Sequence, residues 1–219
     1  MPVEPGSTIA GYPVIELLGT GGMGEVYLVE NPQLGRREAM KVVSVAGSSN
    51  PDFGQRFTNE ARTAASLDHP SIITIYAHGI DDDRPWFTMA YIDGADLAHI
   101  RLTPAELGVV LDQVGGALDY AAGRGVVHRD IKPGNIVVTR NADGAVDRAT
   151  LLDFGIAKLA DSPQLTAANS VVGTVAFTAP EVISGEHADA RSDQYSLACT
   201  MYQMLSGTPP FTAPTSTGV

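Results

Sequence analysis

Residues 128–135 carry the side chains best suited to chemistry in this chain. The segment reads HRDIKPGN and brings an acid, a cation and an amide close together in Asp130, Lys132 and Asn135. Transfer of a phosphoryl group needs a base that orients the attacking hydroxyl, ligands for a metal ion and positive charge near the moving phosphate. We therefore expect Asp130 to act as the base, Asn135 as a metal ligand and Lys132 as the nearby charge.

A second acidic group follows a short apolar run. Asp153 stands in the tripeptide DFG, directly after residues 149–152, and the glycine behind it frees the backbone. Taken alone the tripeptide is a common turn, but here it lies downstream of Asp130 with a predicted hairpin between them. A carboxylate suits oxygen ligation of magnesium, so we expect Asp153 to hold this metal together with Asn135.

Residues 19–24 form a glycine-rich segment that reads GTGGMG. In a dinucleotide-binding fold such a segment would open a helix, whereas residues 25–29 alternate like a strand. We therefore expect a hairpin turn whose backbone amides lie over phosphates. The members of this segment are Gly19, Thr20, Gly21, Gly22, Met23 and Gly24.

Two charged residues stand in otherwise apolar surroundings. Lys41 lies on the third predicted strand. Glu60 lies on the apolar face of a helix predicted to begin at Pro51, with Asn50 as its cap. Considered singly, each is explained most simply as a surface charge. A Lys41–Glu60 pair would explain both residues together, and ATP phosphates are the other candidate partner for Lys41.

The elements that must position these residues change character along the chain. Short β-favouring runs alternate with turn residues up to residue 91, interrupted by the one helix. After residue 94 the pattern becomes helical, with a capping box at Thr103 and Glu106 opening a helix that Gly123 ends. The predicted strands are 12–18, 25–29, 38–43, 73–79 and 86–92, followed by a hairpin of 135–138 with 149–152 and a buried helix over 192–207.

These patterns predict an α+β fold with two lobes in one domain, residues 1–219. We expect an N-lobe of antiparallel sheet plus one helix over residues 12–91, a hinge at 92–94 and a mainly α-helical C-lobe over 95–219. The chain of 219 residues is long enough to bury a sizeable core. The helix over 192–207 is apolar nearly all round, so we expect it to be central, and Asp193 near its start can complement the helix dipole.

Composition narrows the classes of partner and compartment. The net charge of −11 argues against nucleic acid or an anionic membrane surface as the main partner, because both select basic faces. The single cysteine, Cys199, permits no disulfide within the chain and is expected to pack in the core of a cytoplasmic protein. The N-terminus has no basic and apolar leader pattern, and no apolar stretch is long enough to span a bilayer.

In order, identity and spacing these motifs resemble the Hanks-type protein kinase family, and most of all its actinobacterial Ser/Thr kinases. The resemblance runs from Tyr12 to about Phe211 and includes the segment GTVAFTAPE at 173–181. It implies a bilobal kinase fold, ATP and Mg²⁺ (or Mn²⁺) as cofactors, and Ser/Thr residues of proteins as substrates.

The resemblance also implies roles for single residues. Lys41 would hold the ATP phosphates and pair with Glu60, Met89 would be the gatekeeper, and Tyr91 would lie in the hinge segment. Three apolar side chains would enclose the adenine, namely Val26, Ala39 and Val137. Autophosphorylation would occur at Thr166, with Ser170 as second choice, and would recruit Arg129. Thr174 would help to dock the substrate.

Two departures from the family pattern carry expectations of their own. Ala64, one turn after Glu60, is smaller than the leucine common there, so we expect a looser helix or one set by a partner. After Phe211 the family continues with further helices, which supply an arginine partner for Glu181. We therefore expect a fragment that is less stable than a complete domain or is stabilised by self-association. A homodimer for autophosphorylation, and a membrane anchor outside this sequence, are further expectations.

Three functions remain open at this stage. The leading one is an active Ser/Thr protein kinase. The second is a non-catalytic ATP-binding scaffold, which is disfavoured because Lys41, Asp130 and Asp153 are all present. The third is a small-molecule kinase, which is disfavoured because residues 173–181 resemble a peptide-docking loop.

Overall fold

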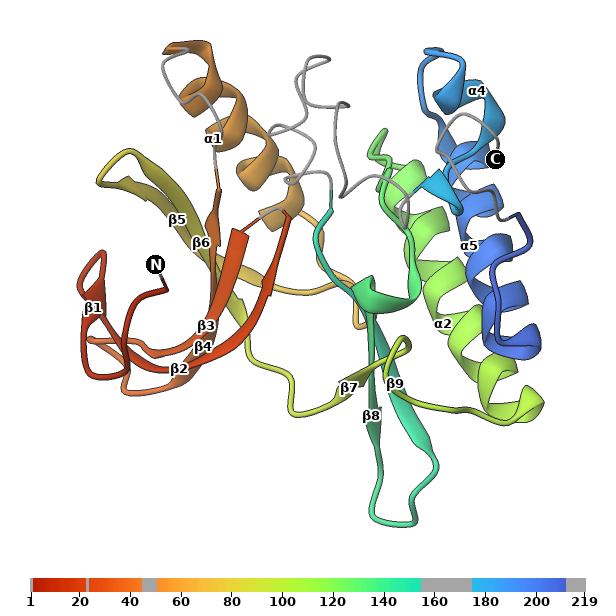
Figure 1. Cartoon of the computed structure of the whole chain (residues 1–219), viewed down its shortest axis with the longest axis horizontal. Coiled ribbons are helices and arrows are strands. Elements are labelled where there is room, and N and C mark those ends of the chain that lie inside the picture. The colour runs from red at the N-terminus through yellow and green to blue at the C-terminus, as the bar shows by residue number, and fades with distance from the viewer. Residues whose placement is uncertain (1, 23, 45–50, 155–174, 212–219) are drawn as a thin grey trace. The chain divides into compact units, whose positions relative to one another are not determined.

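The computed structural model describes residues 2–22, 24–44, 51–154 and 175–211. The described residues form two compact units. Of the described residues, the first unit takes in those up to Asp68 and residues 74–91, and the second takes in residues 69–73, 92–154 and 175–211. The units differ in composition, since the first is mainly sheet and the second mainly helix (Figure 1). The predicted α+β class is confirmed.

A six-stranded antiparallel sheet forms the first unit, in the order β1-β2-β3-β4-β6-β5. One face of the sheet buries a cluster that includes Tyr27, Met40, Val42 and Trp86. Alternation places these side chains together, because residues directly opposite each other in paired strands share a face. The strands are β1 (Thr8–Ile9), β2 (Tyr12–Gly21), β3 (Gly24–Glu30), β4 (Arg37–Val43), β5 (Ile75–Asp81) and β6 (Arg84–Ala90).

Helix α1 (Pro51–Ala65) packs against β5 and β6 of the same unit. Its buried stripe comprises Phe57, Ala61 and Ala64, which recur at helical spacing. The ring of Phe57 meets His78 of β5 edge-on at a centroid distance of 6.4 Å. The helix predicted from this periodicity is therefore present, and Asn50, its predicted cap, lies outside the described residues.

The second unit combines a small sheet with helices. Strands β7 (Ala95–Asp96), β8 (Ile136–Arg140) and β9 (Val146–Leu151) pair in sequence order, and the 3-10 turn η1 (Pro133–Asn135) leads into β8. Helix α2 (Pro104–Ala122) packs on β9 and lies beside α5 (Ala190–Ser206), while α4 (Pro180–Ile183) is short (Figure 1). The hairpin and the capping box at Thr103 and Glu106 are as predicted.

Helix α5 differs from its prediction in two respects. It begins at Ala190, because the carboxylate of Asp189 accepts from the backbone N–H groups of Arg191 and Ser192. Its buried face runs from Ser192 to Met201 and includes Cys199, but Tyr202 is 51% exposed and Leu205 is 63% exposed. The helix is therefore not covered all round by the described residues. Across those residues we find no helix with the length and apolar character needed to cross a bilayer.

Candidate functional site

Strand register gathers the predicted nucleotide-contacting residues of the first unit on one face of its sheet. Lys41 lies opposite Val26 of β3 and opposite Phe87 of β6. In a neighbouring row, Ala39 lies opposite Met89. Residues two apart on a strand point to the same side, so Val26, Ala39, Lys41 and Met89 share that face. Lys41 is only 7% exposed, so its ammonium is not an ordinary surface charge.

The glycine-rich segment closes the β2–β3 hairpin, as its sequence predicts. Gly24 has a φ of +135°, and a Cβ atom there would lie 2.0 Å from the carbonyl oxygen of Val42. The fold itself therefore requires glycine at this position. Gly19 and Gly21 differ, because a Cβ at either would meet nothing within 4 Å. The packing of this unit therefore does not explain those two glycines, and their role over phosphates stays a prediction.

Three further residues predicted to belong to the ATP site lie outside strands β3, β4 and β6. Glu60 is half-buried on α1, and its pairing with Lys41 stays a prediction. Tyr91 is 36% exposed at the end of the first unit. Val137 belongs to β8 of the second unit, where it pairs with Asp96.

The turn around Asp130 forms a compact polar group in the second unit. The Lys132 ammonium lies 2.8 Å from Asp130 Oδ2. The Asn135 amide donates to the same oxygen at 2.9 Å and to the Asp130 carbonyl at 2.7 Å. Asp130 is 5% exposed, so the two donors compensate its buried charge. Both side-chain bonds go to Oδ2, so neither of these two donors engages Oδ1.

Asp153 lies next to this turn because of the β8–β9 pairing. Ile136 opposes Leu151, and one step further the Leu152 N–H donates to the Asn135 carbonyl at 2.9 Å. Asp153 follows with a φ of +59°, a left-handed conformation that non-glycine residues seldom adopt. The structure therefore brings Asp130, Asn135 and Asp153 together within one unit.

A buried carboxylate on α5 holds the start of the turn around Asp130. Asp193 accepts the backbone N–H of His128 at 2.7 Å and that of Arg129 at 2.8 Å. These bonds fix Arg129, whose φ is +70°. Asp193 is 4% exposed, and burial raises the pKa of its carboxyl group although both backbone bonds favour the charged form.

His128 links the two acidic segments of the second unit. Its Nε2 lies 2.7 Å from the Leu152 carbonyl, which can only accept, so Nε2 carries the proton. Its Nδ1 then accepts the Asp130 N–H at 3.2 Å. The ring is fully buried against Phe154 at 4.6 Å, and burial lowers the pKa of His128. A neutral imidazole thus connects the backbones on which Asp130 and Asp153 stand.

The donor chemistry of Asn135 and Asp153 fits a divalent cation. The Asn135 amide nitrogen donates to Asp130, so the amide oxygen faces elsewhere and can ligate. Amide and carboxylate oxygens are ligands that Mg²⁺ prefers, with substrate phosphates and water completing its shell. Within the described ranges, no three His, Cys, Asp or Glu side chains gather as a complete metal cage.

Sequence reasoning missed the roles of Asp193 and His128. It interpreted Asp193 as a partner for the helix dipole, whereas the carboxylate anchors a turn 64 and 65 residues away. The sequence feature that could have revealed the role of Asp193 was an acidic residue within an otherwise apolar helix. Glu181, expected to need an arginine, accepts a hydrogen bond from the Ser192 hydroxyl at 2.6 Å. Met23, Gly155, Thr166, Ser170 and Thr174 lie outside the described residues.

Comparison with known proteins adds independent findings. Residues 12–218 match the family model of the protein kinase domain. Serine/threonine-protein kinase PknJ of Mycobacterium tuberculosis is 44% identical over 215 residues, which cover 96% of this chain and 36% of that protein. PknF of the same organism is 42% identical over 219 residues, which cover 96% of this chain and 46% of that protein. The chain therefore spans less than half the length of these curated relatives.

A solved structure agrees with the family match. The crystal structure of the Mycobacterium tuberculosis PknI kinase domain has a TM-score of 0.76 to this chain, with 36% sequence identity. The alignment covers 98% of this chain and 81% of that one. Fold and sequence therefore lead to the same assignment.

Proposed function

Because this chain belongs to the protein kinase domain family, we propose that it transfers the γ-phosphate of ATP to Ser and Thr hydroxyls of proteins. One observation carries the proposal. Asp130 is a buried carboxylate whose Oδ2 is engaged by Lys132 and Asn135, and Asp193 and His128 fix the backbone around it. A base held in this way loses little entropy when it orients a hydroxyl.

In the proposed mechanism Asp130 Oδ1 accepts the proton of the acceptor hydroxyl as its oxygen attacks the γ-phosphorus. The bond from that phosphorus to the bridging oxygen of ATP breaks in the same step, and ADP leaves. Lys132, held beside Asp130, offsets negative charge as the phosphoryl group moves. Asn135 keeps the Asp130 side chain in place through its amide nitrogen. Each of these groups acts by position and charge, which is what phosphoryl transfer asks of a protein.

The family uses ATP together with a divalent metal ion. We assign Asn135 and Asp153 as the residues that would hold Mg²⁺ or Mn²⁺, which would neutralise phosphate charge when bound. In the first unit, Lys41 would bind the ATP phosphates and pair with Glu60. Residues 19–24 would cover the phosphates, and Val26, Ala39, Met89, Tyr91 and Val137 would contact the adenine.

Several finer assignments belong to the same proposal. Residues 92–94 would act as a hinge between an N-lobe (12–91) and a C-lobe (95–219). Thr166 or Ser170 would be autophosphorylated, through a homodimer, and Thr174 would help to dock protein substrates. The segment would act in the cytoplasm, with any membrane anchor of the parent protein outside this sequence.

The direct test is incubation of the chain with labelled ATP and Mg²⁺, followed by mass spectrometry. We expect phosphate on protein Ser/Thr residues, including Thr166 or Ser170. In Asp130→Asn the rate should fall by roughly 10²- to 10⁴-fold, the usual contribution of a general base. Transfer at the wild-type rate by Asp130→Asn would refute the role of this carboxylate.

Lys41→Met tests the first unit in the same assay. Methionine fills a similar volume, so thermal unfolding should change little while transfer is lost. ATP binding without transfer in the wild type, also in a chain that continues beyond residue 219, would favour a non-catalytic scaffold instead. Undiminished transfer by Lys41→Met would show that the phosphate assignment is wrong.

A further inference from the structure

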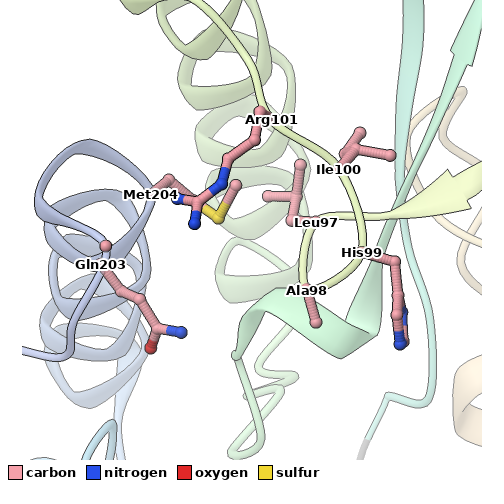
Figure 2. A pocket seen from close by; sticks show the side chains of 8 residues that line it. Leu97, Ala98, His99, Ile100, Arg101, Gln203 and Met204 are labelled. Atoms are coloured by element: carbon pink, nitrogen blue, oxygen red, sulfur yellow. The ribbon is translucent and has the colours of Figure 1, made fainter.

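A pocket of about 240 Å³ lies in the second unit between residues 97–101 and the last turn of α5. Its apolar lining includes Leu97, Ile100 and Met204, and its polar lining includes Arg101 and Gln203. Figure 2 shows the Arg101 side chain directed towards the last turn of α5, beside Met204. The pocket thus combines an apolar wall with a cation and an amide.

Backbone hydrogen bonds join this pocket to the catalytic turn. The N–H of Leu97 donates to the carbonyl oxygen of Pro133 at 3.1 Å and to that of Ile136 at 3.0 Å. Pro133 is the first residue of η1, which ends at Asn135. The pocket therefore borders the segment that follows Asp130 in the sequence, and an extended substrate chain, which advances about 3.3–3.6 Å per residue, would have to span the remaining distance to it.

The charge of the pocket is positive in a chain whose net charge is −11. No carboxylate lines the pocket. Asp96, the acid that precedes the segment, is engaged by the His99 ring at 2.8 Å and by the Ala98 N–H at 2.9 Å. Among the described residues no ion pair involves Arg101, which is exposed.

A purely structural role for Arg101 has one supporting contact. α5 carries no basic residue in its last turn, and the Arg101 guanidinium lies 3.9 Å from where a Cβ of Gly207 would stand. It can therefore offset the partial negative charge of the helix C-terminus. A guanidinium has five N–H donors, however. An exposed guanidinium can therefore still bind an anion through two parallel N–H bonds, an arrangement called a fork.

We propose that this pocket is a specificity subsite for an anionic side chain that flanks the phosphoacceptor of a protein substrate. The anion is a carboxylate or a phosphorylated hydroxyl, bound by the Arg101 fork and the Gln203 amide, with its aliphatic stem against Leu97 and Met204. This inference rests on the proposed function, because it needs a substrate chain at Asp130.

The test is a peptide library with one Ser or Thr acceptor, in which Glu, phosphoserine, Gln or Lys is placed at each flanking position. Wild-type chain should prefer Glu or phosphoserine at one position over Gln there. In Arg101→Glu, KM for the preferred peptide should rise about fivefold, the scale of one exposed charge pair, with a smaller change in kcat. The same variant should gain a preference for Lys at that position.

Matched variants separate specificity from stability and from overall charge. Arg148→Glu reverses another exposed arginine of the second unit, on β9, and should leave the preference unchanged. Arg101→Lys keeps the charge but loses the fork, so it should retain part of the preference. A comparison of Glu with phosphoserine peptides shows which anion the site takes.

The outcomes distinguish this inference from the proposed function. An equal rate for Glu and Gln peptides, or a preference that survives Arg101→Glu, overturns the subsite and leaves kinase activity standing. A lowered unfolding temperature in Arg101→Glu with unchanged preference assigns the residue to the helix end and also overturns the subsite. Failure to phosphorylate any peptide, or the chain itself, would overturn the proposed function and this inference with it.

Discussion

The two units hold their chemical groups by different means. In the first unit, Lys41 and Ala39 are placed by the register of β3, β4 and β6. In the second, Asp130 stands on an irregular turn. This turn depends on the bond that Asn135 donates, on the bond that the Asp130 N–H donates to His128 Nδ1 and, through the backbone of Arg129, on Asp193. A sheet orients many side chains through one repeated pattern. A turn has no such repeat, so each of its strained positions needs its own partner.

Among the variants that test this difference, Asp193→Ala should have the largest effect. Removing the carboxylate leaves the N–H groups of His128 and Arg129 without their acceptor, at about 1–3 kcal/mol for each donor that stays buried. We expect the free energy of unfolding to fall by about 2–4 kcal/mol and kcat to fall with it, because the Asp130 turn loses its anchor. Urea unfolding and the labelled-ATP assay measure the two effects.

Asp119→Ala is the matched control, since Asp119 is an exposed acid on α2 of the same unit. A change there should be within about 0.5 kcal/mol. Equal stability and equal kcat in Asp193→Ala and Asp119→Ala would contradict the view that long-range bonds hold the turn.

The next test compares two glycines of the first unit. Gly24→Ala places a Cβ against the Val42 carbonyl oxygen at a φ of +135°, so we expect a loss of about 2–4 kcal/mol from clash and strain. Gly21→Ala meets open space and should change stability by no more than about 0.5 kcal/mol. Its expected effect is instead a higher KM for ATP.

Urea unfolding and ATP titrations of both variants separate the two roles. If Gly21→Ala unfolds as easily as Gly24→Ala, the hairpin and not the ligand requires that glycine. If neither variant alters KM for ATP, the segment does not lie over phosphates.

The same contrast explains what the sequence could predict. Strands around Lys41 and the stripe on α1 follow periods of 2 and 3.6 residues, which local sequence displays directly. The identity of the groups at Asp130 and Asp153 followed from residue types and spacing. The anchoring by Asp193 did not, because a helix-start acid has a satisfactory local explanation, and no local rule selects a partner 64 residues away.

Glu106 combines both cases, because one of its contacts is local in the sequence and another is long-range. Its capping-box bond with Thr103 was predicted from the sequence, whereas its ion pair with Arg140 at 2.5 Å was not. Hydrogen bonds lower the pKa of Glu106 from 4.5 to about 2. The bond from the Thr103 backbone N–H has the largest effect, and the bond from Arg140 has the next largest. The folded chain thus binds this proton less readily than the unfolded chain does.

Glu106→Gln should therefore produce the smallest effect, and one that depends on pH. A depressed carboxyl pKa stabilises the fold above the unfolded value near 4.5, and this contribution is lost as pH falls towards 2. We expect the wild type to be slightly more stable than Glu106→Gln near neutral pH, with the difference shrinking below about pH 4.5. Urea midpoints of both chains from about pH 6 to about pH 3 measure it. A difference that stayed constant over this range would mean that the Glu106 side chain acts through packing rather than through its charge.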